Sequence, residues 1–321
     1  MKSPDLAPLY LLGLRGAGRV PGPLLRGACN LGADVAWLRH GSGVRQLERN
    51  LRRVRPWMDD RELRRLSRAG MRSYIRYFGE AFAVGSLTRE QILARVRVVG
   101  RENVQPSLDE GRTVVAALGH MGNWDLAGAW GTVDLAPVTT VAERLKPEEL
   151  FQAFLRFRED LGMRIIPLAP GGEVFRELLR VARTGPGLLP LLADRDLTAR
   201  GVEVDLFDER ARVAAGPAAL AVSTGAPLVA ISVHYERLHG ERRRVAGSPW
   251  GVVVTFHPPV VPPTTGSRRE QVAVTTQRWV DQLAGTIENH PEDWHMLQKV
   301  FVADLDPERY AATVAASEAE R

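Results

Sequence analysis

Short apolar runs alternate with amphipathic stretches from residue 96 onward, and this alternation predicts strands and helices in turn. Seven runs are rich in aliphatic and β-branched residues, and we expect strands at residues 96–99, 114–118, 138–141, 165–168, 188–192, 228–233 and 252–256. Helices are expected from Pro147 onward and at residues 173–183, 214–224 and 267–289. The pattern therefore indicates an α/β fold, with a mixed, partly parallel central sheet of about seven strands flanked by helices.

The first 90 residues have a different pattern, in which apolar positions recur at helical spacing among many arginines. Leu24, Leu31 and Leu38 fall on one stripe, and residues 45–76 predict one or two further helices after Pro56. The segment holds 17 Lys and Arg against 8 Asp and Glu, a net charge of +9, whereas the rest of the chain carries −4. Such a basic segment favours an anionic partner.

Three interpretations are open for this basic segment. It can be a solvated helical face, a platform that docks on an anionic membrane lipid surface, or a nucleic-acid-binding region. No nucleic-acid motif accompanies the charge, so we favour the membrane platform and expect no nucleic acid as a partner. The expected division is a helical membrane-docking segment at residues 1–90, an α/β core at 91–310 and a tail at 311–321, all within one integrated domain.

The apolar run at residues 9–14 predicts neither a cleaved signal nor a membrane span, because Arg15, Arg19 and Pro21 interrupt it. We therefore expect the protein to associate with a membrane peripherally. The single cysteine, Cys29, excludes an internal disulfide and fits a reducing compartment. No Cys or His cluster has the spacing of metal ligands, so we expect neither a metal nor a cofactor.

The candidate chemistry lies between a predicted strand and a predicted helix, in the hexapeptide His-Met-Gly-Asn-Trp-Asp. His120 and Asp125 are five residues apart, a spacing that separates them on one helix but lets them meet across a turn. A carboxylate on one imidazole nitrogen fixes the tautomer and leaves the other nitrogen as a base near neutral pH. Such a base can take the proton of a hydroxyl that then attacks a carbonyl carbon. The alternative is a buried histidine satisfied by an aspartate that caps the helix.

The hexapeptide contains no serine or cysteine, so direct transfer to an acceptor alcohol is simpler than a covalent acyl-enzyme. With Asn123 as the N-cap, free N–H groups at the helix start, near Gly122 and Asn123, are expected to bind an oxyanion or a phosphate. Ligands in such folds bind beyond the carboxyl ends of the strands. We therefore expect His120, Glu143 and Asp194, which each follow a predicted strand, to share one rim of the sheet.

The stretch GHMGNWDLAGAW around His120 resembles the His-x4-Asp (HX4D) signature of glycerolipid-type acyltransferases, and its Gly-Asn-Trp core resembles the lipid A late acyltransferase branch. Residues 141–168, 191–229 and 290–301 are similar to the actinobacterial members of that family, which are phosphatidylinositol mannoside acyltransferases. The similarity covers most of residues 113–301, in order. It departs at Asp208, where the family pattern has a glycine.

This resemblance implies that His120 is the general base and Asp125 its acidic partner. It implies that Glu143 and Arg158 line the acceptor pocket and that Asp194 orients the base or the acceptor. Arg144 is implied to lie near the oxyanion. It also implies transfer of a long-chain acyl group, palmitoyl, from acyl-CoA to a mannose hydroxyl of phosphatidylinositol mannoside. The expected location is the cytoplasmic face of the plasma membrane. An acyltransferase for a lysophospholipid or another glycolipid, and a non-catalytic lipid-binding protein of the same fold, are the alternatives.

Overall fold

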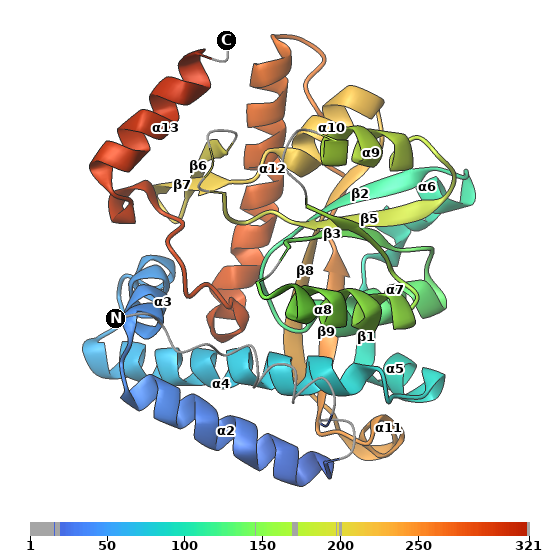
Figure 1. Ribbon diagram of the computed structural model, residues 1–321, viewed down its shortest axis with the longest axis vertical. Helices are drawn as coiled ribbons and strands as arrows, with labels where there is room; N and C mark the ends of the chain where they lie inside the picture. Colours follow the sequence, from blue (N-terminus) through green and yellow to red (C-terminus); the bar gives the residue numbers. More distant parts are fainter. Residues whose placement is uncertain are drawn as a thin grey trace.

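A mixed five-stranded sheet forms the centre of the computed structural model, which describes residues 16, 20–144, 146–168, 173–196, 198 and 201–319 (Figure 1). Its strand order is β1 (Val96–Val99), β9 (Trp250–Phe256), β8 (Leu228–Arg237), β2 (Thr113–Leu118) and β5 (Gly187–Leu192). Neighbouring strands are parallel except for β8 and β9. Every residue of β2 is buried, as expected for an apolar strand covered on both faces. The predicted α/β fold with a mixed sheet is confirmed.

The prediction of about seven strands in this sheet is wrong, because two of the predicted strands pair only with each other. β3 (Thr139–Ala142) and β4 (Arg164–Pro167) form a separate parallel pair beside β5. Val138 makes one bridge to Leu188 of β5. The next backbone N–H along that edge would come from position 190, but Pro190 has none, so the ladder of hydrogen bonds stops there. The Pro190 carbonyl instead accepts a hydrogen bond from the Thr140 hydroxyl at 2.6 Å.

A hairpin that the apolar pattern did not predict contains Asp208. It consists of β6 (Val202–Leu206) and β7 (Glu209–Val213). Phe207 and Asp208 both have positive φ, 52° and 60°, as a two-residue type I′ turn requires. Glycine is favoured in such positions, and aspartate is among the few side chains that tolerate them. The turn therefore forms with Asp208 in place of the glycine of the family pattern.

Helices cover both faces of the central sheet. They are α5 (Arg89–Arg95), α7 (Trp124–Asp134), α8 (Glu148–Asp160), α9 (Glu173–Val181), α10 (Gly216–Thr224) and α12 (Arg268–Asn289). Val115 and Ala117 of β2 belong to the core under α9, α10 and α12, in which Trp279 is completely buried. Val114 and Ala116 point to the opposite core, with α5, α7 and α8. Successive side chains of β2 therefore pack alternately into the two hydrophobic cores on opposite faces of the sheet.

Further elements lie between and after these: α6 (Gln105–Asp109), α11 (Gly240–Ala246), α13 (Pro307–Ala319) and 3₁₀ turns at η2 (Arg101–Asn103), η3 (Pro291–Asp293) and η4 (Val302–Asp304). The predicted tail at residues 311–321 is helical as far as residue 319, because α13 begins at Pro307. The apolar run at residues 9–14 lies outside the described residues.

Among the described residues, α5 and three longer helices precede the first strand, and α4 lies between α2 and the strands (Figure 1). The three longer helices are α2 (Gly22–Leu38), α3 (Ser42–Val54) and α4 (Asp60–Val84). The helical spacing predicted α2 and α4, whereas α3 lies before Pro56 and not after it. Asp59 forms a capping box that starts α4. Leu24, Leu31 and Leu38 on α2 are 66%, 66% and 68% exposed. Across the described part of the chain, no helix combines the length and the apolar character needed to cross a bilayer.

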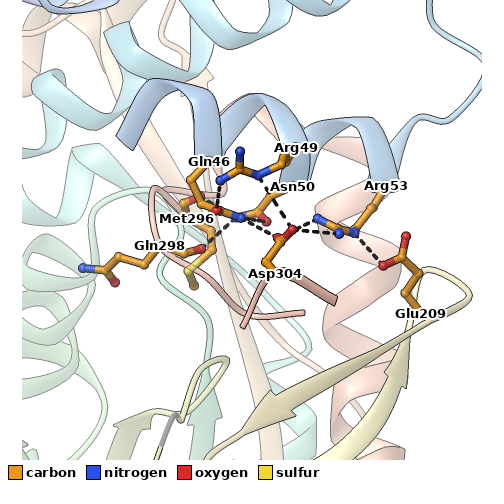
Figure 2. A network of polar contacts seen from close by, with 8 residues as sticks. All are labelled: Gln46, Arg49, Asn50, Arg53, Glu209, Met296, Gln298 and Asp304. Carbon is orange, nitrogen blue, oxygen red and sulfur yellow. Dashed lines mark hydrogen bonds and ion pairs between the residues drawn. The ribbon is translucent and has the colours of Figure 1, made fainter. Parts of the chain in front are cut away.

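A polar network joins α3 to the C-terminal part of the chain (Figure 2). The Asn50 side chain donates hydrogen bonds to two backbone carbonyls of the segment 296–298, at 2.8 and 3.0 Å. Arg53 donates to Asp304 at 2.8 Å and to Glu209 on β7 at 2.7 Å. These half-buried contacts attach the N-terminal helices to the sheet-bearing part of the molecule.

Replacing Arg53 by glutamine should lower the free energy of unfolding by about 3 kcal/mol, because the nearly buried Asp304 carboxylate loses its ion-pair partner. Arg49 approaches the same carboxylate at 3.7 Å but is 51% exposed. Arg49→Gln should therefore cost less than about 1 kcal/mol. Urea denaturation of the two variants measures the difference. Equal losses would contradict a special contribution of the buried pair.

Candidate active site

The loop that carries His120 connects β2 to α7 through a turn that requires glycine. Gly122 has a φ of +55°, and a Cβ atom there would lie 2.6 Å from the carbonyl oxygen of Val233. Asn123 caps α7, because its side-chain oxygen accepts a hydrogen bond from the N–H of Leu126 at 3.0 Å. The predicted strand–turn–helix junction is confirmed, and His120 lies just beyond the carboxyl end of β2.

Asp194 is the acid that holds the imidazole. His120 Nδ1 lies 2.5 Å from Asp194 Oδ1, and the backbone N–H of His120 donates to Asp194 Oδ2 at 2.9 Å. Trp294 Nε1 donates to the same oxygen, also at 2.9 Å. These contacts fix the ring, and Nε2 has no hydrogen-bond partner among the described residues. Because the His120 side chain is 29% exposed, this nitrogen is accessible as a base.

The electrostatics favour an ionised Asp194. Burial raises the pKa of this carboxyl, but the positive charge and hydrogen bonds of His120, with the hydrogen bond of Trp294, outweigh burial and hold the pKa below its usual value. A negative charge beside Nδ1 fixes the tautomer that leaves Nε2 unprotonated. It also stabilises the imidazolium that forms when Nε2 accepts a proton.

Asp125, the acid that we expected beside the imidazole of His120, contacts the guanidinium group of Arg158 instead. Arg158 Nε donates to Asp125 Oδ1 at 2.7 Å, and the Tyr77 hydroxyl donates to Oδ2 at 2.8 Å. The first turn of α7 points the Asp125 side chain toward α4 and α8, which carry these two partners. Burial lowers the pKa of Arg158, yet the Asp125 carboxylate outweighs burial and raises it above its ordinary value. Asp125 therefore fixes a charged guanidinium.

A cavity of about 550 Å³ opens beside His120, where the carboxyl ends of β2, β3 and β5 meet. Six of its lining residues are ionisable: His120, Asp125, Glu143, Arg158, Arg195 and Asp196. Apolar walls come from Leu118, Val141, Met163 and Leu192 among others. The expected meeting of strand-end residues is confirmed, since Glu143 lines this cavity and Asp194 holds the ring that opens into it.

None of the three residues expected at the oxyanion lines this cavity in the described part of the chain. The N–H of Gly122 donates to the carbonyl of Asp293 at 3.0 Å, and Asn123 is completely buried. Arg144 forms an exposed ion pair with a glutamate of α8, at 2.9 Å, and is absent from the described cavity wall. Arg195, which directly follows Asp194, lines the wall instead.

A segment far along the chain holds the His120 loop. Residues 120–122 and 293–295 pair like two short antiparallel strands, and the N–H of His295 donates to the carbonyl of His120 at 2.7 Å. No catalytic or binding role of this segment was predicted from the sequence. The available signal was the stretch at residues 290–301, which resembles the family although it contains no predicted strand or catalytic pair.

Asp293 is a buried carboxyl in this segment, and its ionisation costs stability. Its oxygens accept hydrogen bonds from the Ser73 hydroxyl at 2.5 Å and from the N–H of Tyr235 at 2.7 Å. Burial raises the pKa of Asp293 to about 6 despite these hydrogen bonds. The folded state therefore binds more protons than the unfolded state between about pH 4 and pH 6, and Asp293 lowers stability as the pH rises through that range.

Asparagine at position 293 should remove this loss and stabilise the protein by about 2 kcal/mol above pH 6. The amide oxygen can still accept from Tyr235, and the amide nitrogen can donate to Ser73. Urea unfolding of both proteins on either side of this pH range measures the effect. The difference between Asp293→Asn and the parent chain should shrink below about pH 4. A variant less stable than the parent at neutral pH would contradict the argument.

His290, Glu292 and Asp293 bring three potential metal-ligand atoms within 4.8 Å of one another. Both oxygens of Asp293 already accept hydrogen bonds, so its carboxylate has reduced capacity to bind an ion. We assign no metal to this group.

The site combines an oriented base, a partly exposed ring nitrogen and a cavity with two arginines, which suits attack of a hydroxyl on a carbonyl carbon. The family described as bacterial lipid A biosynthesis acyltransferase matches residues 5–302. The chain belongs to this family. The resemblance found in the sequence is thereby confirmed, and the protein is an acyltransferase of the lipid A type.

Two phosphatidylinositol mannoside acyltransferases are similar to this chain over nearly their whole length. The phosphatidylinositol mannoside acyltransferase of Mycolicibacterium smegmatis is 39% identical over 304 residues, which cover 94% of this chain and 93% of that protein. The protein of the same name from Mycobacterium tuberculosis (strain H37Rv) is 39% identical over 308 residues, which cover 94% and 90%. The identity therefore includes both the N-terminal helices and the sheet.

Among solved structures, a similarity extends to the 1-acyl-sn-glycerophosphate (LPA) acyltransferase PlsC from Thermotoga maritima. The match covers 82% of this chain and 95% of that chain, with 17% identity and a TM-score of 0.37. A superposition this loose adds nothing to the assignment of fold or function.

Proposed function

We propose that this acyltransferase moves a long-chain acyl group, palmitoyl, from acyl-CoA to a mannose hydroxyl of phosphatidylinositol mannoside. The observation that carries the proposal is the hydrogen-bonded pair of His120 and Asp194, whose atoms are 2.5 Å apart, at the wall of a cavity of about 550 Å³. The names of the two mycobacterial relatives support the choice of acceptor.

His120 acts as the general base in this proposal. Its Nε2 takes the proton of the acceptor hydroxyl, and the oxygen attacks the thioester carbon to give a tetrahedral intermediate. Collapse of the intermediate expels the thiolate of CoA, which takes the proton back from the imidazolium. Because a thiolate is a good leaving group, the reaction needs neither a metal nor a covalent acyl-enzyme.

The cations of the cavity bind the negative charges of the substrates in this proposal. Arg158 is fixed by Asp125 and offers its remaining N–H groups to a phosphate of the acceptor. Arg195 takes the oxyanion role expected earlier of Gly122, whose N–H is already bonded. Glu143 accepts hydrogen bonds from sugar hydroxyls at the exposed rim.

The outer face of α2 is the proposed contact with an anionic membrane at the cytoplasmic face of the plasma membrane. Leu24, Leu31 and Leu38 expose about two thirds of their surface along this face. The surrounding N-terminal segment carries a net charge of +9, which attracts anionic lipid headgroups. Protein binding to anionic vesicles but not to DNA would distinguish this partner from a nucleic acid.

Incubation of the purified protein with labelled palmitoyl-CoA and a panel of acceptors tests the reaction, with the products identified by mass spectrometry. We expect label on phosphatidylinositol mannoside and at least about tenfold less on a lysophospholipid or another glycolipid. Label on one of these other acceptors alone would assign the alternative acyltransferase. Absence of both transfer and slow thioester hydrolysis would indicate a lipid-binding protein without catalysis.

A further inference from the structure

A second cavity, of about 270 Å³, lies between α2, α4 and the ends of β8 and β9. Leu25 and Cys29 of α2, Glu80 of α4 and Trp250 of β9 contribute to its walls. None of the residues that line it also lines the cavity beside His120, within the described part of the chain. The mechanism proposed above therefore gives this second cavity no role.

Positive charge dominates this cavity. Four arginines contribute to its walls: Arg26, Arg72, Arg76 and Arg237. Arg72 forms an ion pair with Asp34 at 2.6 Å and shares that carboxylate with Arg68. The other three guanidinium groups form no hydrogen bond or ion pair with any residue that the structure describes. Glu80 is the acid in the wall; burial raises the pKa of its carboxyl, and the nearby Arg76 and Arg95 oppose this shift.

Trp250 orders two of these cations. The guanidinium carbon of Arg76 lies 3.8 Å from the centre of the Trp250 ring, and that of Arg237 lies 4.0 Å from it. Arg237 and Trp250 are register partners on β8 and β9, so the strand pairing itself sets their separation. A guanidinium stacked on an aromatic face keeps its N–H edges free for an anion.

We propose that this cavity binds a phosphate group, held by Arg26, Arg76 and Arg237. Guanidinium groups pair with phosphate oxygens through two parallel hydrogen bonds, and three of them offset the double charge of a phosphate monoester or the single charge of a diester. The volume also leaves room for part of the group that carries the phosphate.

The position of the cavity favours the phosphate of a membrane lipid. Its wall includes the inner face of α2, and the opposite face of that helix carries the exposed Leu24, Leu31 and Leu38. If α2 lies on a bilayer, the cavity is about one helix diameter, ~10 Å, from the lipid contact. A free phosphate has the same chemistry and is the second possible source.

The single cysteine of the chain reports on occupancy, because Cys29 lines this cavity and is partly exposed. Its labelling by N-ethylmaleimide can be followed by mass spectrometry at mildly alkaline pH, because burial raises the pKa of this thiol. The probes are dihexanoylphosphatidylglycerol below its micelle concentration, inorganic phosphate, and octyl glucoside as a lipid-like control without phosphate, all at one ionic strength. No acyl donor is present, so the result does not depend on the proposed reaction.

We expect the phosphatidylglycerol to slow labelling about fivefold or more at concentrations where octyl glucoside has no effect. Protection by phosphatidylglycerol at lower concentration than by inorganic phosphate identifies a lipid source. Equal protection by the two identifies a free phosphate group, and both results support the proposal. No protection by either probe, or equal protection by octyl glucoside, would overturn it.

Arg237→Gln is the decisive variant, because Arg237 is exposed at the end of β8 and its removal leaves the cores intact. The concentration of phosphatidylglycerol needed for half-protection should rise about tenfold in this variant. The matched control is Arg269→Gln, which removes the same charge from an exposed position near the start of α12 and should change that concentration less than about twofold. Equal shifts in the two variants would show general charge attraction and would overturn the site.

Discussion

Alanine in place of His120 should lower the rate of acyl transfer about a thousandfold at saturating substrates, because the reaction loses its general base. The fold should persist, since the backbone N–H of His120 and not its ring donates one of the hydrogen bonds to Asp194. Transfer from labelled palmitoyl-CoA measures the loss, and circular dichroism and vesicle binding should match those of the parent chain.

The matched control for this experiment is His239→Ala, because His239 is exposed at the start of α11 and contributes nothing to the cavity beside β2. Its transfer rate should equal that of the parent chain. A rate near the parent value in His120→Ala would remove His120 from the mechanism and with it the proposed direct attack.

Asparagine in place of Asp194 should lower kcat about a hundredfold to a thousandfold with little change in the KM for the acceptor. An asparagine can turn its NH₂ group toward Nδ1 of His120, which selects the tautomer that carries its proton on Nε2 and cannot act as a base. Asparagine has nearly the same volume as aspartate, so the packing around position 194 is preserved. The indole N–H of Trp294 and the backbone N–H of His120 both need an oxygen acceptor there. They keep one only if the NH₂ group of the asparagine points to the imidazole ring. The preserved packing therefore enforces the wrong tautomer.

Asp125→Asn separates the two acids of the site. Because Asp125 contacts Arg158 and Tyr77 and not the imidazole, this variant should raise the KM for the acceptor more than it lowers kcat. Steady-state kinetics with both variants decides the assignment. If Asp125→Asn lowers kcat as much as Asp194→Asn at unchanged KM, then Asp125 supports the base electrostatically, as the sequence first suggested.

The sequence contained the signals for the elements and for two candidate partners of His120, but it did not decide between those two acids. All seven predicted strands exist, because each depends on a local apolar run bounded by turn residues. The number of strands in the central sheet depends on a single missing N–H at Pro190, which hydrophobicity does not reveal. Asp125 and Asp194 were both candidates, and the direction of the first turn of α7 decides between them.

The remaining parts of the site depend on contacts between segments distant in the chain. The N–H of Gly122 was expected to bind an oxyanion, and only the fold shows that the carbonyl of Asp293 already occupies it. Tyr77 gave no signal of its contact with Asp125, because an aromatic residue on a helix is as typical of a core as of a site. Trp294 lies in a stretch similar to the family, which marked the region but not the bond to Asp194.

Because residues 120–122 pair with residues 293–295, the His120 loop can take its final position only after residue 295 has been synthesised. A nascent chain on the ribosome contains His120 and Asp194 long before the partner of the loop has been translated. A prematurely terminated product that ends before residue 290 retains both of these side chains, yet it lacks the strand-like clamp and Trp294. We expect such fragments to lack acyl transfer, because the backbone pairing that holds the His120 loop is missing from them.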